Sequence, residues 1–215
     1  MIFVNFKTYK EGTGKEAVKL AKICREVSKT TSLKIIPLVQ VVDIFRLASL
    51  DLEVWAQHLD DINFGPNTGQ ILPQAILAAG ARGTVLNHSE NKLPPPVIGS
   101  IVTRCKRLEL KTLICAESIE EAKEIAEFKP NFLAYEPPEF IGSRTASVST
   151  AKPEVIRDFV KEIKTVPILV GAGVHSQEDV KTALKLGAKG ILVATDVVLA
   201  KNPKKELIDL AGGFK

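Results

Sequence analysis

Eight short apolar segments recur along the chain, and most of them precede a stretch in which apolar residues follow helical periodicity. They span residues 2–6, 35–39, 52–56, 83–87, 112–116, 132–136, 167–171 and 190–194. Apolar and polar residues do not alternate regularly in these segments, as they would in a strand with one face exposed to solvent. Apolar runs of about five residues are typical of strands buried on both faces, in parallel sheets covered by helices.

The segments between these strands carry helical patterns with recognisable ends. Helices are predicted over residues 15–29, 117–128, 153–163 and 176–186. Pro153 suits the first turn of its helix, and Ser176 with Asp179 resembles a capping box. A shorter helix is predicted over 42–50. Another follows the fourth strand, where the prolines at 94–96 are expected to break it before it resumes.

Eight alternations of strand and helix can close in two ways, as an open doubly wound sheet or as a (β/α)8 barrel. The chain has 215 residues, which gives about 27 residues per unit, near the lower limit for the barrel. The count of eight favours the barrel. No linker, shift in composition or fixed-period repeat divides the chain. We therefore predict an α/β fold in which residues 1–215 form one domain, a barrel with a parallel eight-stranded sheet.

Composition and charge narrow the classes of function. Hydrophobic residues make up 45% of the chain and charged residues 25%, as in ordinary globular domains. The net charge is +4 without a long basic run, so nucleic acid is not expected as a partner. No apolar stretch approaches the ~20 residues that cross a bilayer and no export signal opens the chain, so no membrane is expected. Three widely spaced cysteines indicate a reducing compartment, and we expect a cytoplasmic protein.

Polar residues directly after the strands are the candidates for chemistry, because the carboxyl ends of parallel barrel strands open on one face. They are Asn5, Lys7, Gln57, His58, Asn87, His88, Ser89, Glu90, Glu136 and residues 171–173 and 194–196. They offer a carboxylate base, an imidazole, an ammonium group and two small-residue loops whose N–H groups can approach an anion. Each also has a plainer interpretation: Lys7 as a solvated surface lysine, His88 as a loop residue, and Glu136 as a charge that ends a strand.

Seven motifs resemble the triosephosphate isomerase family, in its short archaeal form, along essentially the whole chain. They are VNFKTY at 4–9, AQH with INFGPNTG within 56–69, GTVLNHSEN at 83–91, LICA at 113–116, AYEPPEFIG at 134–142, LVGAGV at 169–174 and GILVAT at 190–195. Their order and spacing both agree with the family. The resemblance implies a barrel enzyme that interconverts dihydroxyacetone phosphate and D-glyceraldehyde 3-phosphate through an enediolate, in glycolysis and gluconeogenesis.

By this resemblance Glu136 is the general base that moves a proton between the two carbons beside the carbonyl oxygen. His88, kept neutral by a helix start at residues 88–90, polarises the carbonyl, and Lys7 stabilises the developing oxyanion. Asn5 orients the substrate. Glu90 holds Lys7 in place, with Ser89 as a further supporting residue. The family needs no metal or redox cofactor.

The resemblance also implies a phosphate site and a lid. The phosphate would contact the backbone N–H groups of Gly142, Gly173, Ala194 and Thr195, helped by a helix that begins after the eighth strand. The lid would run from Pro137 to about residue 147, with Ile141 as its apolar cover.

Two stretches depart from the family pattern. In the lid, Gly142 is followed by Ser143 and Arg144, where the family has Thr and Gly. After Thr195 the chain has Asp196, where the family has Gly, and a carboxylate beside a phosphate is repelled by it. The interpretation we favour turns Asp196 outward to stabilise its own helix start. The alternative is that Arg144 reaches Asp196 or the phosphate and compensates the charge.

Two other functions stay open at this point. The chain could be a phosphate-binding relative that has lost turnover through its altered lid and Asp196. It could also be another phosphosugar isomerase, although the His and Asp set of a metal-dependent epimerase is missing, since His58, His88 and His175 lie on separate loops.

Residues 58–68 resemble the family loop that inserts into a neighbouring subunit. We therefore expect self-association, a tetramer in preference to a dimer, since the proline-rich region 93–101 lies where short archaeal forms make extra contacts.

Overall fold

The computed structural model describes residues 1–50, 52–137 and 153–215, and in these residues the strands form a closed parallel barrel in sequence order. The strands are β1 Ile2–Asn5, β2 Ile35–Val39, β3 Trp55–Ala56, β4 Gly83–Leu86, β5 Lys111–Ala116, β6 Phe132–Tyr135, β7 Ile168–Val170 and β8 Gly190–Val193. The last strand closes on the first through the pairs Ile2–Ile191, Phe3–Leu192 and Val4–Val193. The predicted barrel is confirmed.

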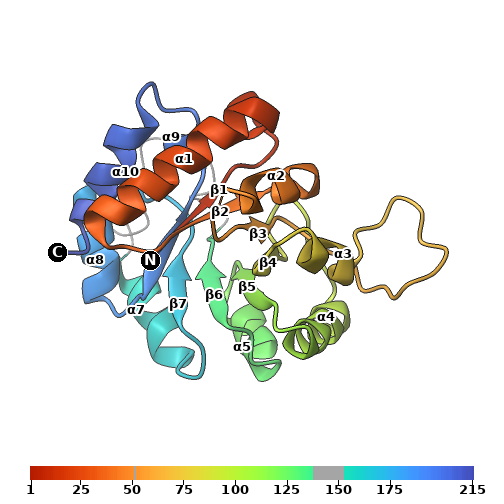
Figure 1. Ribbon diagram of the computed structural model, residues 1–215. Coiled ribbons are helices and arrows are strands. Elements are labelled where there is room, and N and C mark those ends of the chain that lie inside the picture. The colour runs from red at the N-terminus through yellow and green to blue at the C-terminus, as the bar shows by residue number, and fades with distance from the viewer. Residues whose placement is uncertain (51, 138–152) are drawn as a thin grey trace.

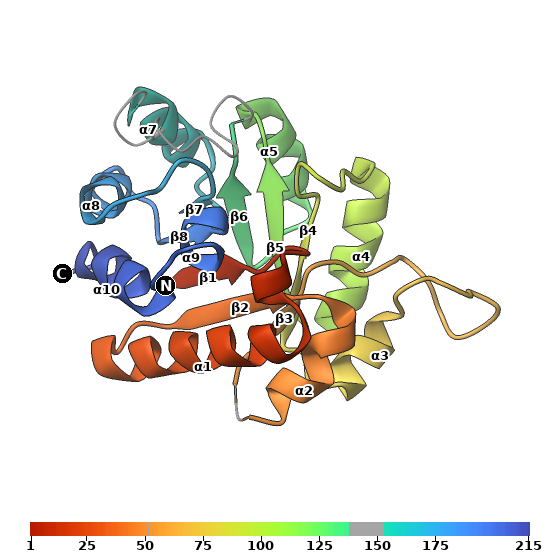
Figure 2. The same ribbon diagram turned by 90° about the horizontal axis from the view of Figure 1, so that it is seen from above.

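Helices surround this barrel on its outer side (Figures 1 and 2). They are α1 Gly14–Thr31, α2 Ile44–Ala48, α3 Pro73–Ala78, α4 Pro95–Arg107, α5 Ile119–Glu127, α7 Pro153–Glu162, α8 Gln177–Lys185, α9 Thr195–Val198 and α10 Pro203–Gly212, with short 3-10 turns η1 Lys10–Gly12 and η2 Val41–Asp43. The predicted capping of α8 is confirmed, because the Ser176 hydroxyl accepts the Asp179 N–H at 3.2 Å.

The prediction that prolines break the helix after the fourth strand is wrong. The prolines at 94–96 do not break a helix; they begin one. Pro94 caps α4, and Pro95 and Pro96 occupy its first turn, where a missing N–H costs no hydrogen bond because the first-turn N–H groups have no partner within the helix.

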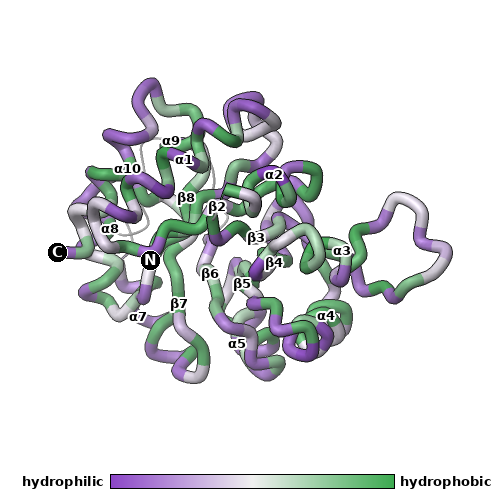
Figure 3. The backbone as a smooth tube through the Cα atoms, in the orientation of Figure 1, coloured by the Kyte–Doolittle hydropathy of each residue, from purple (hydrophilic) through white to green (hydrophobic). Residues whose placement is uncertain are grey.

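Two apolar layers hold the barrel together. Inside it, residues such as Phe3, Leu38 and Leu169 from different strands fill the lumen. Between barrel and helices, the alternate strand positions pack with the apolar helix faces, as Val4 does. In the tube coloured by hydropathy, the strands at the centre are largely apolar, and the surrounding helices alternate between polar and apolar residues (Figure 3).

Several strands stop one residue before the apolar run ends, which leaves a polar or small residue in the loop. Glu136 follows β6, Gly171 follows β7 and Ala194 follows β8. The side chains predicted to carry chemistry therefore lie at the carboxyl-end rim of the barrel. Within the described residues, no helix is long and apolar enough to cross a membrane.

Candidate active site

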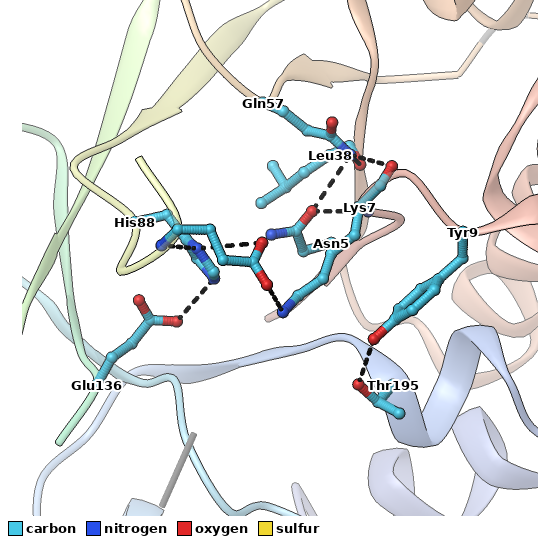
Figure 4. A network of polar contacts seen from close by, with 9 residues as sticks. Asn5, Lys7, Tyr9, Leu38, Gln57, His88, Glu136 and Thr195 are labelled. Carbon is cyan, nitrogen blue, oxygen red and sulfur yellow. Dashed lines mark hydrogen bonds and ion pairs between the residues drawn. The ribbon is translucent and has the colours of Figure 1, made fainter. Parts of the chain in front are cut away.

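The loop after β1 is held by the side-chain amide of Gln57, a residue to which the sequence analysis assigned no role. Lys7 adopts a left-handed backbone, with φ of 48°, and its N–H donates to Asn5 Oδ1 at 3.0 Å. The Gln57 amide Nε2 lies 3.3 Å from Asn5 Oδ1, 2.9 Å from the Lys7 carbonyl oxygen and 3.2 Å from the Leu38 carbonyl oxygen (Figure 4). A non-glycine residue at positive φ persists only where its surroundings hold it, and Gln57 supplies that hold.

His88 is oriented by the loop that carries it. The backbone N–H of Glu90 donates to His88 Nδ1 at 3.1 Å. Because Nδ1 accepts this hydrogen bond it carries no proton, so the neutral ring bears its proton on Nε2. We expected a helix start at residues 88–90 to keep the ring neutral. No helix begins there, because these residues form a turn and α4 begins at Pro95, so this expectation is wrong.

Asn87 fastens this turn to the barrel. It is buried, with a φ of 57°, and its amide donates to the Cys115 carbonyl oxygen at 2.9 Å and to Glu121 Oε1 at 2.8 Å. Its own carbonyl oxygen accepts the Leu93 N–H at 2.9 Å. An asparagine tolerates a left-handed backbone and can bridge three segments at once, which explains why it directly precedes the histidine.

Glu136 lies buried at the end of β6, with 4% of its surface exposed, facing His88 (Figure 4). Its Oε1 is 3.6 Å from His88 Nε2, while its Oε2 is buried without a hydrogen-bond partner among the described residues. Gly171 makes room for it, because a Cβ there would come within 2.6 Å of Glu136 Cγ.

Burial raises the pKa of Glu136 above its usual 4.5, against the lowering effects of His88, the Cys115 thiol and Lys7. A carboxylate that is buried and short of donors is a stronger base than one in water. Perturbed carboxylates of this kind concentrate in active sites.

A chain of contacts joins the remaining polar side chains to this base. The Glu90 backbone N–H donates to His88 Nδ1 at 3.1 Å, and Glu90 Oε1 lies 2.7 Å from Lys7 Nζ. The structure thus brings Glu136, His88, Glu90 and Lys7 to one face, with Asn5 beside Lys7. The Ser89 hydroxyl is buried and has no partner among the described residues.

Three of the four residues predicted to bind phosphate, Gly173, Ala194 and Thr195, lie on the loops after β7 and β8, which are neighbouring strands. Gly173 has a φ of 61°, and Ala194 caps the one-turn helix α9 that Thr195 begins. The Thr195 hydroxyl meets the Tyr9 hydroxyl at 3.1 Å, which joins this helix to the loop after β1 (Figure 4).

Asp196 occupies the first turn of α9, as expected, but its carboxylate has a partner that the sequence did not suggest. Its Oδ2 lies 2.6 Å from His175 Nδ1. Pro137, the first residue of the predicted lid, is buried. The other residues predicted for the lid and the phosphate site, Ile141, Gly142, Ser143 and Arg144, lie outside the described residues, and so does the predicted compensation by Arg144.

The arrangement defines a class of protein. A buried carboxylate faces an imidazole that presents an N–H, with an ammonium group beside both, at the face where parallel barrels carry their active sites. Such a set can remove a proton beside a carbonyl group and stabilise the oxyanion that forms. No group of three or more His, Cys, Asp or Glu side chains in the described part of the chain could hold a metal ion. The buried carboxylate, the imidazole and the ammonium group at the rim of a closed parallel barrel indicate an enzyme of acid–base chemistry.

Known proteins identify the family. The sequence model of triosephosphate isomerase matches residues 1–211. The triosephosphate isomerase of Methanothermus fervidus is 42% identical over 215 residues, covering 98% of this chain and 96% of its own, and that of Saccharolobus solfataricus is 41% identical over 213 residues, covering 97% and 93%. A crystal structure of the Bartonella henselae enzyme, 20% identical, superposes with a TM-score of 0.72 and covers 99% of this chain and 96% of its own. The chain belongs to the triosephosphate isomerase family, and the protein is an isomerase.

Proposed function

We propose that the protein interconverts dihydroxyacetone phosphate and D-glyceraldehyde 3-phosphate, the reaction of glycolysis and gluconeogenesis. The observation that carries the proposal is the buried Glu136 carboxylate, whose Oε1 lies 3.6 Å from His88 Nε2. The other ring nitrogen, His88 Nδ1, accepts a hydrogen bond from the Glu90 N–H. Glu136 removes a proton from one carbon of the triose and returns it to the next.

In this mechanism the neutral His88 ring donates from Nε2 to the substrate oxygens as the enediolate forms. Lys7, whose ammonium group is paired with Glu90, places positive charge beside the same oxyanion. Asn5 orients the substrate from the neighbouring position. Catalysis by a neutral histidine is established for this family, and these steps are carried over to the chain from its relatives.

The phosphate, on this proposal, is bound by the backbone N–H groups of Gly142, Gly173, Ala194 and Thr195. The loops after β7 and β8 are the usual location of phosphate sites in such barrels. Pro137, Ile141, Ser143 and Arg144 belong to the lid, which excludes water while the enediolate exists.

The test is turnover of glyceraldehyde 3-phosphate, followed by coupled NADH oxidation and by deuterium uptake beside the carbonyl in heavy water. We expect activity in the parent and a fall in kcat of at least about 1000-fold in Glu136→Gln, with no loss in the exposed control Glu124→Gln. A parent that binds phosphoglycolate tightly but neither turns over nor exchanges the proton would instead be a phosphate-binding relative. Turnover of a different phosphosugar only would indicate another isomerase.

We also propose that the chain self-associates through residues 58–68, as a tetramer in preference to a dimer. This loop extends away from the barrel between β3 and α3 (Figure 1), and its Phe64 is 77% exposed. Arg104 of α4 holds the loop through Asp61, with Nη2 3.0 Å from Oδ1. Val42 and Phe45, at η2 and α2, are also largely exposed. A subunit contact over these side chains would remove their apolar surface from water, which favours association.

Light scattering tests the assembly. We expect four times the chain mass of 23.4 kDa in the parent and a shift toward smaller species in Phe64→Glu. A mass near that of one chain in the parent would contradict the proposal, and twice that mass would support the dimer.

The remaining proposals concern organisation and location. We propose that residues 1–215 form one domain and that the protein acts in the cytoplasm. The free, buried thiols of Cys24, Cys105 and Cys115 are compatible with a reducing compartment.

A further inference from the structure

The contact between His175 and Asp196 joins two segments that lie on either side of the proposed phosphate site. His175 follows Gly173 by two positions, on the loop after β7. Asp196 follows Thr195 in α9, after β8. His175 Nδ1 and Asp196 Oδ2 are 2.6 Å apart, which makes this one of the shortest polar contacts near the rim.

His175 is held firmly in this place. Its backbone N–H donates to Asp179 Oδ2 at 3.1 Å, and the Ser176 hydroxyl donates to the same oxygen at 2.8 Å. Asp179 in turn donates its N–H to Ser176 Oγ, which closes the cap of α8. The imidazole therefore projects from a rigid helix start, and it can fix the position of a side chain on the next loop.

The hydrogen bond also sets the proton position on the ring. A carboxylate oxygen only accepts, so His175 Nδ1 is the donor. His175 Nε2 is buried and has no partner among the described residues. Among the described residues, the hydrogen bond of the His175 ring is therefore the one that Nδ1 donates to Asp196 Oδ2.

The acidic residues of α10 are unfavourable neighbours for the Asp196 carboxylate. Glu206 and Asp209 of α10 are close, and the pKa of Glu206 is raised first by burial and then by the negative charges of Asp196 and Asp209. Electrostatic interactions with His175 and then Lys205 oppose this rise in the pKa of Glu206. A carboxylate free to turn from these acids toward a phosphate one or two residues away would repel it.

We propose that His175 is a positioning residue for phosphate binding: it holds the Asp196 carboxylate against α8, away from the anion, and ties the loop after β7 to the start of α9. This inference rests on the proposed function. It explains how the chain keeps an aspartate at a position where its family carries a residue without charge.

The experiment compares His175→Ala, Asp196→Asn and the double variant in two measurements, steady-state kinetics with glyceraldehyde 3-phosphate and competitive inhibition by inorganic phosphate. In His175→Ala we expect KM and the phosphate inhibition constant to rise about tenfold or more, with kcat within about threefold of the parent. In the double variant both constants return to within about threefold of Asp196→Asn, because the charge that His175 restrains is gone.

Two outcomes would overturn the inference. An unchanged phosphate inhibition constant in His175→Ala would show that the contact is idle. A double variant as weak as His175→Ala would show that the imidazole supports the loop itself and not the charge of Asp196. Both presuppose an active parent enzyme, and a parent without turnover would instead contradict the proposed function.

Discussion

The two ends of the barrel are built in opposite ways. At the amino end, Phe3, Trp55 and Phe132 pack edge to face or tilted, with ring centroids 4.9, 5.8 and 6.2 Å apart. The Trp55 indole N–H donates to Glu53 Oε1 at 3.1 Å, so this apolar plug leaves its one polar group satisfied. Gly83 admits the indole, since a Cβ there would come within 2.6 Å of it.

The carboxyl end carries the opposite features. Lys7 and Asn87 adopt left-handed backbones directly after strands, whereas Ser32, Glu109 and Lys129 do so where helices end, a common and inexpensive place for them. Glu136 Oε2 and Ser89 Oγ are buried without partners among the described residues. Packing at one end thus stabilises the barrel, while the other end holds the strained and underbonded groups of the proposed active site.

The largest effect should come from Glu136→Gln, which separates the contribution of Glu136 to turnover from its effect on stability. We expect turnover to fall by at least about 1000-fold, while the melting temperature at pH 7 rises by roughly 2–5 °C. The reason is that an uncharged amide avoids the cost of burying an underbonded carboxylate. Calorimetry and the coupled assay measure the two effects, and a less stable Glu136→Gln would mean that the site is not strained.

The sign of the pH dependence follows from the same group. The folded-state pKa of Glu136 is raised above 4.5, so its cost is absent below the unfolded pKa and appears as pH rises through the folded pKa. The stability gain of Glu136→Gln should therefore vanish near pH 4. The acid limb of kcat/KM in the parent should lie above 4.5, because Glu136 must be ionised to act as a base. Glu124→Gln should alter neither curve.

At the amino end, Trp55→Ala should lower the free energy of unfolding by about 3–5 kcal/mol, because it leaves a cavity. Denaturant titration measures this loss. The kcat/KM of the remaining folded enzyme should stay within about twofold of the parent, because the indole packs with Phe3 and Phe132 and touches none of the proposed catalytic side chains. Ile208→Ala, at a half-exposed apolar position on α10, is the control and should cost less than about 1 kcal/mol. A large loss of kcat/KM in folded Trp55→Ala would contradict the division between the two ends.

Gly171→Ala tests how closely the base is positioned. A Cβ at Gly171 would displace Glu136 Cγ, which lies 2.6 Å from that position. A shift of about 1 Å in a catalytic group can cost up to 100-fold, so we expect kcat to fall about 10- to 100-fold with little change in KM. Gly99→Ala creates a similar clash with Phe128, at 2.8 Å, on the outside of the barrel. It should reduce stability and leave kcat unchanged, and equal kcat losses in both variants would refute a local effect.

Sequence pattern predicted the strands better than the helices. Apolar runs buried on both faces leave a continuous signal, and all eight correspond to strands in the described residues. The helix α10 was not predicted, although Asn202, which accepts the Lys205 N–H at 3.0 Å, and Pro203 after it form a recognisable start. The prolines at 94–96 were interpreted as breakers because one proline signal marks both the start and the end of a helix.

The reactive side chains were predictable from position and motif, but their supports were not. Glu136 and His88 follow apolar strands and match family motifs, and contacts join them. Gln57 acts through bonds to segments 19 to 52 residues away, and His175 through a partner 21 residues away. No local pattern encodes such pairings, since they exist only once the barrel brings distant strand ends together.

The smallest expected effect concerns Tyr9, which belongs to the carboxyl end without touching the base. Its hydroxyl meets the Thr195 hydroxyl at 3.1 Å and so joins the start of α9 to the loop after β1. In Tyr9→Phe we expect KM to rise about two- to fivefold with kcat unchanged, because one neutral hydrogen bond contributes about 1 kcal/mol. Thr195→Val removes the same bond from the other side. If the bond is the cause, the double variant should be no weaker than the weaker single variant, and additive losses would show that each hydroxyl acts separately.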